Sequence, residues 1–256
     1  MTFILTLTRI TLIEALRTRL ALLAVGIAIL GVGASQFLNQ IALTESREIQ
    51  VAFVATAFRA SAVFLVVAFT ITSTIRDSND KIIEFLLAQP VPRSAYFYGK
   101  YLGLGVVNIS LAMIFSSTMI LLGPSYAGLA TWAVSLAMEL YLMSAVALFC
   151  ALSIPHVVTA FASTAGFYLL ARSIDTIRLI ASASPNADPG FADTVIRRIV
   201  ELIAWVMPAL DTVTRTDWLV TYAPGWLAMG SLATQILLYT VLVGTATLFD
   251  LHRKSF

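Results

Sequence analysis

Apolar residues are concentrated in six long runs along this chain, and short polar segments separate them. A helix that crosses a membrane needs about 20 predominantly apolar residues, and each run reaches or approaches that length. The pattern predicts an all-α polytopic membrane protein with a single transmembrane domain over residues 1–256. The predicted spans are residues 20–38, 51–75, 101–122, 132–154, 157–174 and 226–249.

The segment 193–207 has the clearest amphipathic pattern in the chain. Its apolar residues fall on one side of a helical wheel, and Arg197, Arg198 and Glu201 fall on the other. Because it is too short and too charged to span, we expect an outer amphipathic helix before the sixth span. It would lie in the membrane interface or pack on the spans.

Two further segments have helical patterns outside the spans. Residues 1–19 predict an N-terminal interfacial helix, although their charges do not gather on one face. Residues 77–89 predict a short amphipathic helix, with Asp77 as a candidate N-cap and Pro90 as its stop. The second helix either links two spans along the membrane surface or docks a cytoplasmic partner.

The composition supports a membrane location and excludes several classes. Only 12% of the residues are charged and 59% are hydrophobic, whereas about a quarter are charged in an ordinary soluble domain. A soluble domain, a disordered chain and a nucleic-acid-binding protein are therefore excluded. Cys150 is the only cysteine, and His156 and His252 are the only histidines, so we expect no metal site.

The basic residues predict the orientation of the chain. Nine Lys or Arg residues fall in segments 1–19, 76–100 and 250–256, whereas Arg47 is the only one in the two short loops of the other side. Cytoplasmic loops carry the excess of positive charge, so both termini are expected in the cytoplasm. The connection between the fifth and sixth spans carries five arginines and argues the other way, but the rule weakens in long connections.

Two charged residues lie clearly inside predicted spans, Arg59 in the second and Glu139 in the fourth. A charge within a membrane is costly and is a functional candidate by default. Because the two lie at similar depth, we hypothesise that they pair across adjacent helices. A static pair that holds the bundle is the favoured interpretation; a role in gating or substrate passage, or no contact at all, are the alternatives.

The sequence has no motif for nucleotide hydrolysis or for an intramembrane catalytic site. Gly99-Lys100 lacks the pattern of a phosphate-binding loop, since Ser94 stands where the first glycine belongs and Tyr101 follows the lysine. We therefore expect that the chain is not an enzyme and binds no cofactor itself.

The segment 76–100, RDSNDKIIEFLLAQPVPRSAYFYGK, resembles the membrane subunits of type-2 ABC transporters, the ABC-2 permease family. Two departures from the family pattern are Asp80-Lys81, where Gly-Thr is usual, and Pro92, where Ser is usual. The number of spans, the N-terminal helix and the insertion before the sixth span fit the same family. The matching residues are Glu84, Leu86, Leu87, Pro90, Arg93, Gly99 and Lys100.

The resemblance implies a permease subunit, most simply of an exporter in a bacterial inner membrane. ATP and Mg would bind to a separate cytoplasmic ATPase, and two permease chains, identical or related, would pair. Residues 77–89 would then be the coupling helix. The residues that it places at the ATPase are Asp80, Lys81, Glu84 and Phe85, with Pro155 and His156 as a second contact.

Two other classes stay open on the sequence alone. One is an ABC-type complex that acts mechanically on a partner protein instead of transporting a substrate. The other is a membrane scaffold without any ATPase.

Overall fold

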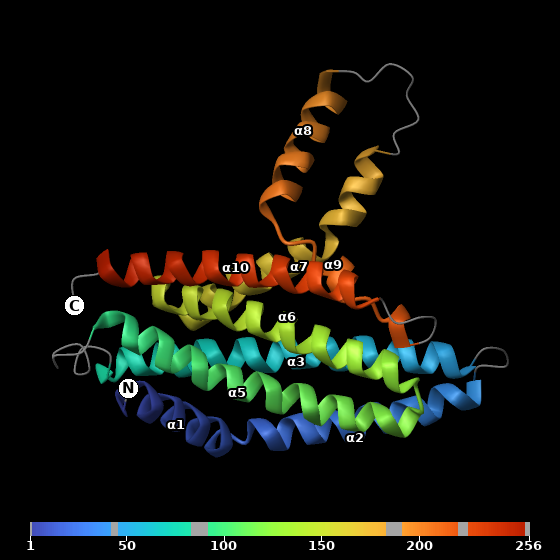
Figure 1. Cartoon of the computed structure of the whole chain (residues 1–256), viewed down its shortest axis with the longest axis horizontal. Helices are drawn as coiled ribbons and strands as arrows, with labels where there is room; N and C mark the ends of the chain where they lie inside the picture. The colour runs from blue at the N-terminus through green and yellow to red at the C-terminus, as the bar shows by residue number, and fades with distance from the viewer. Residues whose placement is uncertain (1, 42–45, 83–91, 183–190, 220–224, 254–256) are drawn as a thin grey trace.

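The computed structural model describes residues 2–41, 46–82, 92–182, 191–219 and 225–253 (Figure 1). All regular structure within these residues is helical, and six helices are long and apolar enough to cross a membrane, as in a multi-pass membrane protein. The helices are α1 (Thr2–Arg17), α2 (Leu20–Ile41), α3 (Ser46–Asn79), α5 (Arg93–Met119), α6 (Tyr126–Ser153), α7 (Val157–Ser182), α8 (Phe191–Val206), α9 (Leu210–Val213) and α10 (Trp226–Arg253), with 3-10 turns at Ile120–Leu122 and Asp217–Leu219.

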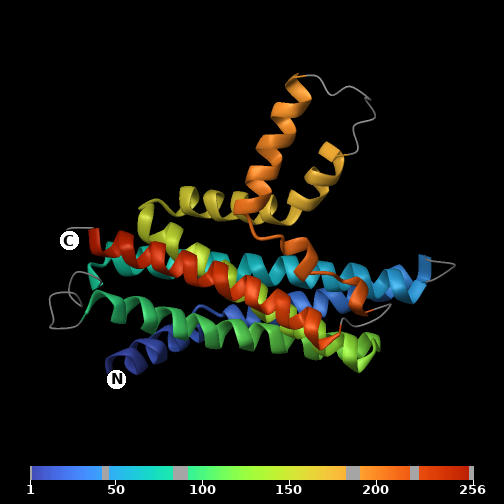
Figure 2. The same cartoon turned by 45° about the horizontal axis from the view of Figure 1, so that its top comes forward.

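The long helices run side by side in a bundle whose two ends differ. The start of α1 and the end of α10 lie near the same end, together with the end of α3, the start of α5 and the turn from α6 to α7 (Figures 1 and 2). We call this the terminal end and the opposite one the far end. Helices α3 and α6 are central: α3 contacts α2, α5, α6 and α7, and α6 also contacts α10. The core between them contains Phe58, Phe115 and Trp132.

The third and fourth spans begin earlier than hydropathy predicts, because polar residues at their starts have partners. Helix α5 begins at Arg93 rather than near residue 101, and Arg93 Nη1 donates to the carbonyl oxygens of Leu251 and His252 at 3.1 and 3.2 Å. These carbonyls end α10, where a cation is favourable. Helix α6 begins at Tyr126 after Ser125, whose Oγ accepts from Gly128 N at 3.1 Å.

The expectation that Asp77 starts a separate helix is wrong. Helix α3 continues through Asp77 to Asn79, and its end is marked by Lys81, which has a left-handed backbone with φ of 55°. The helix continues into polar sequence because Asp77 is bound by side chains of α5. The rest of the predicted segment, from residue 83 to residue 89, lies outside the described residues.

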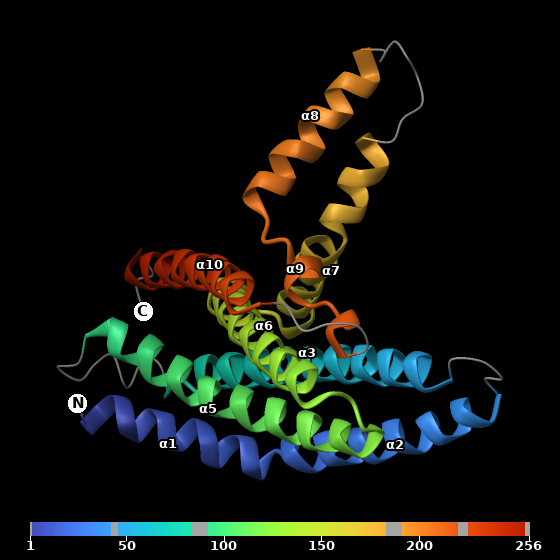
Figure 3. The same cartoon turned by 45° about the vertical axis from the view of Figure 1, so that its right-hand side comes forward.

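Helices α7 and α8 form a hairpin that leaves the bundle sideways (Figures 1 and 3). Helix α7 starts at the terminal end, runs along the bundle, and then bends away before the far end (Figure 2). It extends to Ser182, past the predicted limit of residue 174. Helix α8 covers nearly the same residues as the amphipathic segment 193–207, but it packs on α7 and not on the other spans.

The first helix packs along the start of α5 instead of standing alone. Its buried residues are Leu7, Thr11 and Ala15, whereas Ile10 and Ile13 stay exposed. A helix with one face on protein and an exposed apolar face is suited to a membrane interface.

Candidate functional site

A fully buried ion pair lies in the middle of the bundle. Arg59 Nη1 on α3 is 2.6 Å from Glu139 Oε2 on α6, and both side chains are 0% exposed. Each residue lies 13 positions after the start of its helix, which is about 20 Å at the rise of an α-helix. The contact hypothesised from the sequence is therefore present in the structure.

One face of α6 supplies the other partners of Arg59. Ser135 Oγ accepts from Arg59 Nη2 at 2.9 Å, and the Trp132 ring centroid lies 5.4 Å from Arg59 Cζ. Residues 132, 135 and 139 lie three and four positions apart, so they stack on one side of the helix. This stripe surrounds the guanidinium with a carboxylate, a hydroxyl and an aromatic face.

A second arginine reaches the same carboxylate from α7. Arg172 Nη1 lies 3.6 Å from Glu139 Oε1 and donates to Thr214 Oγ1 at 2.9 Å. Thr214 directly follows α9, at the base of the hairpin. Glu139 thus joins α3 to α7, and Arg172 extends the connection to the segment after α9. We call Arg59, Trp132, Ser135, Glu139 and Arg172 the mid-bundle cluster.

The electrostatics of the mid-bundle cluster favour a structural role, in which it holds α3, α6 and α7 together. Removing one partner of a buried pair leaves an uncompensated charge and costs about 3 to 5 kcal/mol. Here a single carboxylate serves two guanidinium groups, so Glu139 is the member on which the most contacts depend. The same geometry makes the packing of α7 on the bundle sensitive to a change at Glu139.

A second polar cluster lies near the terminal end and was not anticipated from the sequence. Lys100 Nζ on α5 is 2.7 Å from Asp77 Oδ2 and donates to Ser73 Oγ at 2.6 Å. Glu14 on α1 accepts from Ser73 Oγ at 2.6 Å and lies 3.5 Å from Lys100 Nζ. Tyr96 donates its hydroxyl to Asp77 Oδ2 at 3.2 Å. We call these five residues the end cluster.

The end cluster joins three helices, and its two carboxylates share one buried lysine. Lys100 is 2% exposed, and its two carboxylate partners are 16% and 18% exposed. Arg76, 3.8 Å from Glu14 Oε1, supplies a second and exposed cation. The cluster therefore fixes α1 against α3 and α5 at the point where these two helices flank residues 83–91.

Two glycines allow α1 to approach α5 closely enough for these contacts. A Cβ on Gly99 would lie 2.9 Å from Leu7 Cβ, and one on Gly103 would lie 2.7 Å from Thr11 Cβ. Thr8 Oγ1 also donates to the carbonyl oxygen of Gly99 at 3.1 Å. The Gly-x-x-x-Gly spacing that begins α5 is thus a helix contact.

The residues that the resemblance placed at an ATPase lie at the terminal end where they are described. Asp80 and Lys81 are exposed just after α3, and Pro155 and His156 are exposed in the turn between α6 and α7. The carbonyl oxygen of His156 accepts from Ala160 N at 3.0 Å at the start of α7. Glu84 and Phe85 lie outside the described residues.

Sequence reasoning missed Lys100, Asp77 and Glu14 because each was assigned to a loop or an interfacial segment. A usable signal was present: Ser73 and Asp77 are four residues apart, as are Tyr96 and Lys100. Each pair lies on one helix face if α3 and α5 extend past their apolar runs. Arg172 was also missed, since it follows the charge-free part of the fifth run.

Comparison with known proteins finds no family model that matches the chain and no matching curated protein.

Proposed function

We propose that the chain is the permease subunit of an ABC-type transporter, most simply an exporter in a bacterial inner membrane. A separate cytoplasmic ATPase would bind ATP and Mg, and the chain would carry no catalytic residues of its own. A second copy or a related permease would complete the pathway, with both termini cytoplasmic. The family resemblance of residues 76–100 motivates this proposal.

The observation that carries the proposal is the position of the end cluster. Residues 83–91 connect α3 to α5, and Asp77 and Lys100, on either side of that connection, are joined at 2.7 Å. Glu14 brings α1 into the same contact. A force applied to the connection by a docked ATPase would therefore reach three helices together.

The central α3 would then carry such a displacement toward the mid-bundle cluster. Arg59 lies on the same helix as Asp77 and contacts Glu139, which also contacts Arg172 on α7. This gives a continuous set of packed and ion-paired elements from the terminal end to the sideways hairpin, which is a physical route for coupling.

The test is co-purification of the full chain from native membranes in mild detergent. We expect a stoichiometric ATPase that contains a phosphate-binding loop, and we expect Glu84→Gln combined with Phe85→Ala to release it. The matched control is Glu48→Gln combined with Phe53→Ala, since both residues are exposed at the opposite end of α3. Absence of an ATPase in every detergent, or equal release by both pairs, would contradict the proposal.

A second candidate is an ABC-type complex that moves a partner protein, and the sideways hairpin favours it. Ile199, Leu202 and Val206 on α8 are exposed, as are Leu179 and Ile180 on α7. Such a surface on a projecting element is suited to a partner or to the membrane interface. Flux of candidate compounds into liposomes that contain the complex would support transport. ATP turnover without flux, sensitive to Leu202→Asp, would support the mechanical role.

A further inference from the structure

A row of cavities follows the seam between α2 and α5. A cavity of about 290 Å³ opens at the far end, and one of about 410 Å³ continues from it along the seam. Leu121 lines both, and Ile114 joins the second to a narrow third cavity that reaches Leu12 on α1 and Val107 on α5. The three cavities therefore follow one another along the seam, and we call them together the groove.

The seam is open because α2 packs more closely on α3 than on α5. Gly31 on α2 faces the ring of Phe58 so closely that a Cβ at this position would overlap it. The side of α2 that faces α5 carries small or branched residues, among them Ala28 and Val32. A gap between the two helices remains at membrane depth.

The long part of the groove has an apolar surface, although two hydroxyls line it. Ser117 Oγ and Thr118 Oγ1 both donate to the carbonyl oxygen of Ile114, at 2.8 and 2.9 Å. Their hydrogen-bonding capacity is thus used within α5, and the remaining lining consists of Val, Ile, Ala and Leu side chains. Hydrocarbon can contact such a wall without leaving its polar groups unpaired.

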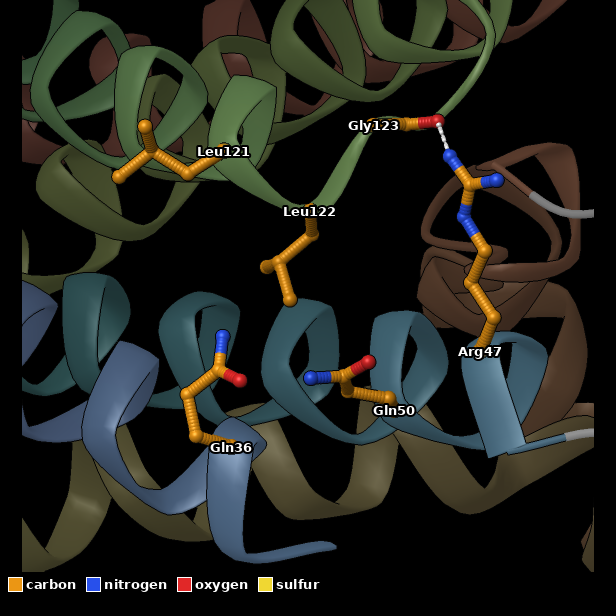
Figure 4. A pocket seen from close by; sticks show the side chains of 6 residues that line it. All are labelled: Gln36, Arg47, Gln50, Leu121, Leu122 and Gly123. Atoms are coloured by element: carbon orange, nitrogen blue, oxygen red, sulfur yellow. Dashed lines mark hydrogen bonds between the residues drawn. The ribbon is translucent and has the colours of Figure 1, made fainter. Parts of the chain in front are cut away.

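The far end of the groove is polar and cationic (Figure 4). Arg47 Nη2 donates to the carbonyl oxygen of Gly123, which holds the guanidinium at the rim of the cavity. The buried Gln50 donates to Ser35 O at 2.8 Å, and Gln36 lies across from it. Glu48 lines a neighbouring cavity that Arg47 and Gly123 also line.

The groove is long enough for the acyl chain of one membrane leaflet. From Leu121, in the 3-10 turn after α5, to Val107 on α5 it follows 14 residues, about 21 Å at the rise of a helix. One leaflet contributes about half of the roughly 30 Å hydrocarbon core. A chain that entered beside Arg47 would therefore lie along the groove over the depth of its leaflet.

We propose that this groove binds a phospholipid of the leaflet at the far end. Its acyl chain lies between α2 and α5, and its phosphate and anionic headgroup lie at Arg47. The positive charge of Arg47 selects an anionic headgroup. The apolar wall, whose two hydroxyls are already hydrogen-bonded within α5, accommodates the acyl chain. This inference needs the chain to span a membrane but does not depend on the proposed ATPase.

The test is native mass spectrometry of the full chain released from nanodiscs. The nanodiscs contain equal amounts of phosphatidylglycerol and phosphatidylcholine with identical acyl chains. We expect one retained lipid per chain, with about a fivefold preference for phosphatidylglycerol, as one basic residue near a lipid headgroup gives. Arg47→Gln removes the preference, whereas Arg47→Lys keeps it.

A second pair of variants tests the groove itself. Ser117→Trp, at an exposed position of the lining, fills the groove and abolishes retention of both lipids, and Thr234→Trp on the exposed face of α10 does not. If Ser117→Trp does not fold, Val25→Trp places a ring at the same groove from α2. Equal retention and preference in all variants overturns the proposal. Loss of a dimer on filling the groove, with lipid retention unchanged, assigns the groove to a second copy and overturns it too.

Discussion

Two polar clusters cross-link this bundle, and they differ in burial and in the helices that they join. The mid-bundle cluster connects α3, α6 and α7 through an ion pair that is 0% exposed. The end cluster connects α1, α3 and α5, and its carboxylates keep partial access to the exterior. Both include α3, so a movement of this helix affects both.

The difference in burial suits the two clusters to different roles, the mid-bundle cluster to holding helices together and the end cluster to transmitting movement between them. A buried pair with one carboxylate between two arginines is costly to disturb and is best explained as a fixed point of the bundle. A partly exposed network of short contacts can exchange partners with water at smaller cost. The end cluster is therefore the better candidate for the part of the bundle that changes during a functional cycle, and the predictions below test this difference.

The largest effect is expected at Glu139. Glu139→Gln leaves both Arg59 and Arg172 without their carboxylate, so we expect a loss of about 3 to 5 kcal/mol or failure to assemble. Arg59→Met should cost less, because Glu139 keeps Arg172 at 3.6 Å. Thermal unfolding in detergent, followed by size-exclusion chromatography, measures both. Equal stability of Glu139→Gln and the wild type would remove the holding role.

The double variant sharpens this prediction. Arg59→Met combined with Glu139→Leu should recover much of the loss, since replacing both members of a buried pair with apolar residues is often neutral. Exchanging the two charges, Arg59→Glu combined with Glu139→Arg, should not recover the lost stability, because an arginine at position 139 would face Arg172. Full recovery of stability in the charge-exchanged variant would show that Arg172 does not interact with residue 139.

The next effect is expected at Lys100, the centre of the end cluster. Lys100→Met removes a charge-assisted contact to Asp77 and one to Ser73, with an expected loss of about 2 to 3 kcal/mol in stability. Arg17→Met is the matched control, because Arg17 is exposed at the end of α1 and belongs neither to the end cluster nor to the proposed ATPase contact. If the end cluster transmits motion, Lys100→Met also lowers ATP turnover of a purified complex while the ATPase stays bound. Turnover equal to that of the control would assign the cluster to stability alone.

A smaller effect is expected from separating α1 and α5. Gly99→Ala places a Cβ 2.9 Å from Leu7 Cβ, so we expect a loss of about 1 to 2 kcal/mol from overpacking. Gly26→Ala is the control, since nothing lies within 4 Å of that position, and alanine favours a helix over glycine. Protease access to α1 and thermal unfolding measure the difference; equal results for both variants would show that the close approach is not required.

The two clusters also show what sequence can reveal. The six spans follow from hydropathy and length, because a membrane-spanning helix must be long and apolar. Arg59 and Glu139 are visible because a charge interrupts an apolar run. Their contact could be hypothesised because both lie at equal depth.

The end cluster could not be found in the same way, because its members look like ordinary loop charges. Lys100 and Asp77 lie beyond the apolar runs, and only their tertiary contact extends α5 and α3 to include them. The link from Arg172 to Thr214 joins residues 42 positions apart. Nothing local in the sequence indicates it.

The smallest effect is expected at Asp211, a carboxyl group that lies next to a second one, Asp175. Burial raises the pKa of Asp211, and the neighbouring Asp175 raises it further. Both line a cavity of about 370 Å³ at the base of the hairpin, together with Arg178 and Arg215. Since the folded state binds this proton more tightly, its stability increases as pH falls from the raised pKa toward 3.8, the ordinary value. In the clusters above, by contrast, each carboxylate has a cationic partner.

Asp211→Asn should remove this pH dependence and stabilise the protein slightly at neutral pH, because the cost of a charged carboxylate at this position is gone. Thermal unfolding at a series of pH values measures the change, and Asp80→Asn, at an exposed position, is the control. A wild-type stability that instead falls over this acid range, with a shallower fall in Asp211→Asn, would mean that Arg178 or Arg215 pairs with Asp211. The base of the hairpin would then resemble the two cation-paired clusters, and the contrast with them would be lost.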